Sequence, residues 1–106
     1  MVKYTLVRME QIRGKQVFDK LVVDGVAPFD TFINELEEIY RSEVRTLYSL
    51  MDAVANLMSL PKTKHLRAYA IEQQGGKIII IGGMKANQAK DETEFRRLKN
   101  GYIASK

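Results

Sequence analysis

The chain has 106 residues, of which 45% are hydrophobic and 28% charged, enough for one compact domain and too few for two separate cores. It contains no cysteine, so disulfide frameworks and thiolate metal sites are excluded. No apolar run approaches the roughly 20 residues of a membrane-spanning helix, and no signal-peptide pattern follows the first residues. The sequence predicts a cytoplasmic single domain over residues 1–106, without a membrane partner.

Basic residues gather in the second half of the chain. Residues 1–60 carry 7 Lys and Arg against 9 Asp and Glu, a net charge of −2, whereas residues 61–106 carry 10 against 4, a net charge of +6. A positive surface attracts polyanions and speeds encounter with them. The asymmetry favours a nucleic-acid partner, but many small basic domains have no such partner.

The first 23 residues predict a β-hairpin. Residues 2–12 alternate with period two, which places Tyr4 and Leu6 on the face opposite Val7 and Met9. The following segment, residues 16–23, is rich in β-branched and aromatic side chains and is closed by an Asp-Gly pair, as a second strand would be.

A helical pattern follows, in which apolar residues recur every three or four positions over residues 29–58. A single helix of that length would be about 45 Å long, longer than a domain of this size is wide. We therefore expect a helical hairpin that breaks near residues 41–43. Ser42 would cap the second helix, Glu43 would lie in its first turn and Pro61 would end it.

Two strands and a terminal helix complete an α+β pattern. Residues 66–72 alternate, a Gly75-Gly76 turn follows, and the four isoleucines of residues 78–81 are typical of a central strand buried on both faces. The last segment opens with a capping box at residues 91–94. Its amphipathic stripe is Phe95, Leu98 and Tyr102. One sheet covered by a few helices is the expected architecture.

The second half of the chain carries a family resemblance. Arg67-x-Tyr69 lies on one predicted strand and Gly76-Lys77 opens the next. The segment that follows is Gly82-Gly83-Met84-Lys85-x-x-Gln88-x-Lys90-Asp91. In order and type, these residues resemble the last two strands and tail of the RelE/ParE/HigB toxins of bacterial toxin-antitoxin systems, over about residues 28–104. The resemblance implies a RelE-like domain, an antiparallel sheet packed on a helical hairpin plus a C-terminal helix.

Two features depart from the family pattern. The family usually has a further strand between the second helix and the Arg-x-aromatic strand, and residues 59–65 leave no room for it. Lys85 is followed by Ala86, where the family usually has a second basic residue. A missing strand would leave a sheet edge open, through which two copies of the chain could pair as a homodimer.

Cationic side chains can support RNA cleavage by a 2′-hydroxyl without a metal or cofactor, because they stabilise the charge that builds on phosphate oxygens. Arg67 and Lys85 are the candidates for this role, and His65 or Tyr102 is available for proton transfer. The resemblance implies catalytic roles for Arg67, Lys85 and Tyr102. The residues expected to bind RNA are Lys62, Lys64, His65 and Arg96.

Each of these residues also has a simpler interpretation. Arg67 and Lys85 could be solvated charges at strand ends, and His65 an ordinary surface histidine. Tyr102 continues the apolar stripe of its helix, so packing alone would explain it. Gly82-Gly83 is favoured as a β-bulge or strand exit over a phosphate cradle, because no G-x-x-x-x-G-K pattern is present.

Two functional hypotheses follow. The favoured one is a toxin that acts as a metal-free endoribonuclease on RNA, including messenger RNA on the ribosome, and is held inactive by a cognate antitoxin. The alternative is a non-catalytic or degenerate relative, either a gyrase inhibitor or an antitoxin-binding module. A nuclease should place Lys64, Arg67 and Lys85 within reach of one phosphate, whereas scattered cations would favour the alternative.

Overall fold

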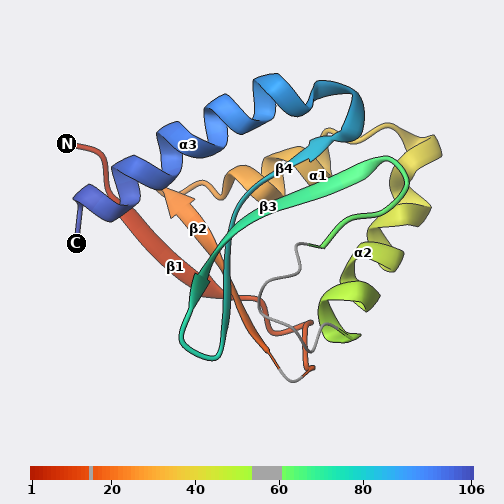
Figure 1. Ribbon diagram of the computed structural model, residues 1–106, viewed down its shortest axis with the longest axis horizontal. Coiled ribbons are helices and arrows are strands. Elements are labelled where there is room, and N and C mark those ends of the chain that lie inside the picture. The colour runs from red at the N-terminus through yellow and green to blue at the C-terminus, as the bar shows by residue number, and fades with distance from the viewer. Residues whose placement is uncertain (15, 54–60) are drawn as a thin grey trace.

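The computed structural model of the chain describes residues 1–14, 16–53 and 61–106. Its elements, in chain order, are β1 (Tyr4–Arg8), β2 (Val17–Val23), α1 (Pro28–Asn34), the 3-10 helix η1 (Glu38–Tyr40), α2 (Arg41–Ala53), β3 (Leu66–Gln73), β4 (Gly76–Met84), the 3-10 helix η2 (Lys85–Asn87) and α3 (Gln88–Ala104). Figure 1 shows these helices and strands arranged as one compact body. The predicted α+β class is confirmed.

The four strands form one sheet in the order β1-β2-β4-β3. The predicted hairpin of β1 and β2 is antiparallel, as is the pair of β3 and β4. The expectation of a wholly antiparallel sheet is wrong, because β2 and β4 pair in parallel. The long connection between these two strands contains α1, α2 and β3, and such a crossover is what a parallel pair requires.

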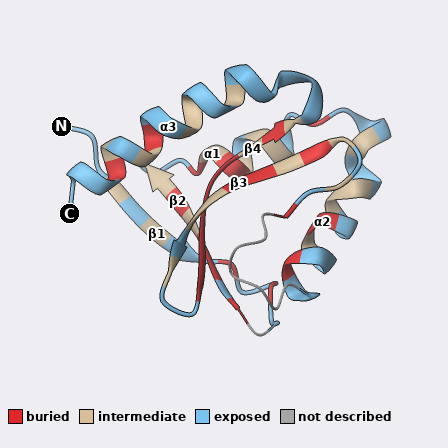
Figure 2. Ribbon diagram, viewed as in Figure 1, coloured by how far each residue is buried: buried red, intermediate tan, exposed pale blue. Residues whose placement is uncertain are grey.

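The isoleucine run of β4 lies at the centre of the sheet, as predicted, and contributes to two cores. Ile79 packs with Phe29 of α1 and Leu47 of α2. Ile78 and Ile80 belong to a second cluster that includes residues of α3. Figure 2 shows β4 buried along much of its length. Because both sides of β4 are covered, the strand offers a rigid frame for the residues at its end.

The predicted helical hairpin is present, but its break lies earlier than expected. α1 ends at Asn34, η1 follows, and α2 begins directly at Arg41. Glu43 lies in the first turn of α2, as predicted. The expected end of the second helix falls on residues 54–60, outside the described residues. α3 begins at Gln88, one turn before the expected capping box, because η2 leads straight into it.

The outer edge of β3 is partly occupied by the residues that precede it. Pro61 O accepts a hydrogen bond from Ala68 N–H at 3.0 Å, and Thr63 N–H donates to Leu66 O at 2.9 Å. A single bridge, between Lys62 and Arg67, stands beside β3 in the described part of the chain. Homodimer formation through this edge therefore stays a prediction.

Gly82 and Gly83 lie within β4, and neither forms a bulge. The register shift of this pair of strands lies instead between Tyr69 and Ala70. A Cβ atom on Gly82 would stand 2.3 Å from the ring of Phe32, and one on Gly83 would stand 2.1 Å from the carboxylate of Asp91. The two glycines give α1 and α3 room to approach the strand.

We expect Gly82→Ala to destabilise the protein by about 1 to 3 kcal/mol, because the added methyl group overlaps the ring of Phe32. Urea unfolding of the wild type and the variant measures this cost. The matched test is Gly82→Ala/Phe32→Leu, in which the smaller side chain should recover part of the loss. Equal stability of wild type and Gly82→Ala would contradict the packing described above.

Candidate functional site

The start of β3 and the end of β4 bring two basic segments together. In their antiparallel register Leu66 is opposite Met84 and Arg67 is opposite Gly83. One step further, the Lys85 N–H donates to His65 O at 2.8 Å. The backbones of His65 and Lys85 are therefore adjacent where the two strands meet, although 20 positions separate the residues in the sequence.

Glu43 of α2 holds the segment that contains His65. One carboxylate oxygen, Oε2, is 2.6 Å from His65 Nδ1. The other, Oε1, accepts hydrogen bonds from the Thr63 hydroxyl at 2.6 Å and from His65 N–H at 3.0 Å. Three groups of the turn before β3 thus bind one carboxylate, which fixes both the backbone and the ring of His65 against α2.

These hydrogen bonds lower the pKa of Glu43 from its ordinary value of 4.5 to about 2, with the Thr63 hydroxyl as the largest cause and the His65 contacts adding to it. At neutral pH the carboxylate is ionised and can only accept hydrogen bonds. His65 must then carry its proton on Nδ1, which leaves Nε2 as the basic nitrogen. In the described part of the chain no group hydrogen-bonds to Nε2, and the side chain is 41% exposed.

An aromatic ring limits the position of the imidazole. The ring of Tyr40, at the end of η1, lies 5.1 Å from the ring of His65, centroid to centroid, with the planes tilted by 58°. The carboxylate on one side and the phenol ring on another restrict rotation of the histidine. The orientation of His65 is thus fixed by a carboxylate and by an aromatic ring.

Arg67 supports the same turn and keeps part of its guanidinium group available. Its Nη1 donates to the carbonyl oxygens of Thr63 at 2.5 Å and Leu66 at 2.8 Å. No described residue accepts a hydrogen bond from Nε or Nη2. Lys64 lies in this turn, is exposed, and precedes His65. The turn therefore presents several cations around a histidine.

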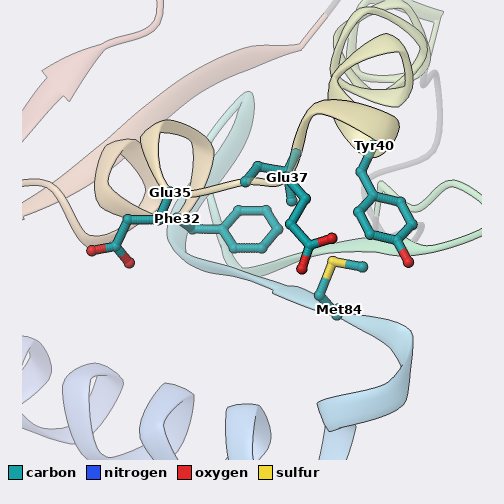
Figure 3. Close-up of a pocket in the computed structure, with 6 residues that line it drawn as sticks. Phe32, Glu35, Glu37, Tyr40 and Met84 are labelled. Carbon is teal, nitrogen blue, oxygen red and sulfur yellow. The ribbon is translucent and has the colours of Figure 1, made fainter.

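A pocket of about 250 Å³ adjoins this turn. Its lining residues are Phe32, Glu35, Leu36, Glu37, Tyr40 and Met84. Figure 3 shows the side chain of Glu37 between the rings of Phe32 and Tyr40, with its carboxylate directed towards Met84. Tyr40 and Met84 connect the pocket to the histidine, since Tyr40 contacts the ring of His65 and Met84 precedes Lys85.

The structure brings most of the predicted site residues to one place. Those in or opposite the turn before β3 are Lys62, Lys64, His65, Arg67 and Lys85. Arg96 is exposed on α3, about 12 Å along the helix from Gln88.

Tyr102 lies near the far end of α3, about 21 Å along the helix axis from Gln88. Its side chain is buried in the second core cluster, with the ammonium group of Lys106 over its ring. The geometry does not bring Tyr102 to the turn, and its packing explains its presence.

Sequence reasoning missed two residues that contact His65, namely Glu43 and Tyr40. Glu43 was expected only as a favourable charge in the first turn of a helix, and Tyr40 only as part of an apolar stripe. Their relation to His65 depends on how α2 packs against the start of β3, and no spacing in the sequence carries that information. The available signal was the isolated His65 itself, next to a threonine and two lysines.

Comparisons with protein families, curated proteins and solved structures found no match to this chain. The function must therefore be argued from the geometry. In the described residues, no group of three or more His, Cys, Asp or Glu side chains is placed to hold a metal ion. No helix in this part of the chain is long and apolar enough to cross a membrane.

The stability of the protein should depend on the ionisation of Glu43. Because its pKa is lower in the folded protein than in the unfolded chain, the carboxylate stabilises the fold above about pH 4.5, and this contribution is lost as the pH falls towards 2. Glu43→Gln should cost about 1 to 2 kcal/mol at pH 7 and almost nothing near pH 2. Urea unfolding of both proteins across this range measures the difference.

Glu38→Gln is the matched control, because it removes the same charge from an exposed side chain that, among the described residues, pairs only with Arg41, at 3.4 Å. Its effect should stay below about 0.5 kcal/mol at every pH. A Glu43→Gln cost that does not change between pH 7 and pH 2 would contradict the ionised hydrogen-bond network.

Proposed function

We propose that this protein is a metal-free endoribonuclease of the RelE/ParE/HigB type, a toxin that cleaves RNA and is held inactive by a cognate antitoxin. The observation that carries the proposal is the 2.6 Å contact between Glu43 and His65 Nδ1, which leaves Nε2 as a base on a residue whose backbone is hydrogen-bonded to that of Lys85. The family resemblance supports it separately, on Arg67 and Lys85. In this proposal the protein acts in the cytoplasm.

The chemistry requires His65 of the turn before β3, Glu43 of α2 and the nearby cations. His65 Nε2 takes the proton of a ribose 2′-hydroxyl, whose oxygen attacks the adjacent phosphorus. The bond from O2′ to phosphorus forms as the bond from phosphorus to O5′ breaks. The products are a 2′,3′-cyclic phosphate and a 5′-hydroxyl end, whose oxygen takes up a proton from water. Glu43 stabilises the imidazolium that forms, as a carboxylate beside a catalytic histidine does.

The cations in and opposite the turn supply the electrostatic stabilisation of the transition state. As two negative charges build on the phosphate oxygens, ammonium and guanidinium groups already in position stabilise them without reorganisation. The Lys85 backbone is hydrogen-bonded to His65, and Nε and Nη2 of Arg67, which bind no acceptor among the described residues, provide paired donors for a phosphate. Lys64 and Lys62 extend the positive surface along the approaching RNA strand.

The test is the cleavage of RNA by the wild type and by His65→Ala, which removes the base. The rate should fall by about 100- to 10,000-fold, the usual contribution of general acid-base catalysis. Expression of both proteins in a bacterial host, with growth recorded and messenger RNA breaks mapped, measures the effect where ribosomes are present. Purified proteins and an RNA oligonucleotide measure cleavage in the absence of ribosomes.

Lys85→Ala should also abolish most cleavage, whereas Lys106→Ala removes the same charge at the far end of α3 and should leave it unchanged. Messenger RNA breaks that persist with His65→Ala would contradict the proposed mechanism. Normal growth and intact RNA with soluble wild-type protein would favour the non-catalytic alternative, a gyrase inhibitor or antitoxin-binding module.

A further inference from the structure

The pocket beside the turn combines features that suit one flat, aromatic, hydrogen-donating ligand. Phe32, Leu36 and Met84 give it apolar walls, and Tyr40 adds a second ring. At about 250 Å³ it lies just below the range of about 300 to 1,000 Å³ that is usual for small-molecule sites, so it suits a single ring system. Rings and thioether groups stack on nucleobases, and this stacking does not depend on which base is present.

Glu37 adds a polar group that would choose between bases. In the described part of the chain its carboxylate has no hydrogen-bond or ion-pair partner, and Figure 3 shows it between Phe32 and Tyr40, directed towards Met84. Its backbone is held, because Glu37 O accepts the Tyr40 N–H at 3.0 Å. Glu35 also lines the pocket, but its carboxylate points away from Met84. One carboxylate, Glu37, therefore faces the space that a base would occupy.

We propose that this pocket binds the guanine base of the nucleotide whose 2′-hydroxyl is activated by His65, an inference that rests on the proposed function. Guanine presents two adjacent donors, N1–H and the 2-amino group, which match the two oxygens of a carboxylate. Adenine and cytosine place a ring nitrogen acceptor beside their amino group, and uracil places carbonyl oxygens on both sides of its N–H. An ionised carboxylate repels those acceptors, so Glu37 selects guanine.

The location of the pocket agrees with this role. Tyr40 lies between the two halves of the site, since its ring lines the pocket and also contacts the ring of His65. Met84 lines the pocket and is followed by Lys85, the cation opposite His65. A nucleotide with its base against Phe32 and Tyr40 would carry its ribose and phosphate towards His65 and Lys85. In this pose the Glu37 carboxylate contacts the base, and the phosphate contacts the cations.

The test combines a binding measurement with a cleavage measurement. Binding of guanosine 3′-monophosphate and of the other three 3′-nucleotides is followed by NMR titration of the wild type, Glu37→Gln and Glu38→Gln. The guanosine nucleotide should bind the wild type about 10- to 100-fold more tightly than the others, the discrimination usual for a bidentate contact. Glu37→Gln should lose this preference, and Glu38→Gln should keep it.

Inosine 3′-monophosphate keeps N1–H but lacks the 2-amino group, so its affinity should fall between those of the guanosine and adenosine nucleotides. In the cleavage measurement, RNA oligonucleotides that differ only in the base 5′ to the break should be cut about 10- to 100-fold faster with guanine there. Only Glu37→Gln should remove that difference.

The two measurements separate the inference from the proposed function. Cleavage at all four bases at similar rates, with no preferred nucleotide in the titration, would overturn the guanine pocket and leave the nuclease standing. Selective binding of the guanosine nucleotide without any cleavage would keep the pocket and overturn the nuclease. Absence of both selective binding and cleavage would overturn both.

Discussion

The antiparallel register of β3 against β4 is the constraint on which the candidate site depends. It sets Leu66 opposite Met84, and one step further it sets His65 beside Lys85. A shift by one residue would turn these side chains to the opposite face of the sheet. The register is held because β4 is covered on both faces and also pairs with β2 on its other edge. The buried isoleucines thus fix the strand end beside which the partly buried His65 lies.

The unequal charges of the two halves of the chain meet at this site. The exposed carboxylates of Glu35, Glu37 and Glu38 follow one another where α1 passes into η1. The cations of residues 62–67 lie in the turn before β3, and Glu43 is the acidic residue that joins the two regions through its contacts with Thr63 and His65. A pocket lined by Glu35 and Glu37 therefore lies beside a basic turn.

Local sequence patterns predicted the helices and strands of this fold. They did not predict the contacts between segments that are distant in the sequence. Alternation predicted β1, β-branched and aromatic composition predicted β2, and the isoleucine run predicted a central β4, because burial leaves a local pattern in the sequence. The parallel pairing of β2 with β4 leaves no such trace, since two strands that pair in parallel and two that pair antiparallel can carry the same buried residues. The order of the strands had to come from the structure.

For the candidate site, too, the sequence predicted local groupings of residues but not contacts between distant segments. Basic residues near one another in the sequence, such as Lys64 and Arg67, could be grouped, and Lys85 could be joined to them through an expected strand pair. Glu43 could not, because its contact with His65 crosses 22 positions and depends on the angle at which α2 meets the sheet. Tyr102 looked like a candidate because the resemblance suggested it, but its position was decided by packing in the α3 core.

The position of β4 in the sequence affects the order in which the sheet can form during synthesis. β4 is the last of the four strands in sequence but lies between β2 and β3 in the sheet. As the polypeptide is synthesised from its N-terminus, β3 has no sheet to join until residues 76–84 have left the ribosome. Glu43 and His65 precede β4 in the sequence, so they are synthesised before the strand that aligns His65 with Lys85. The site can therefore form only when segments that are distant in the sequence have come together.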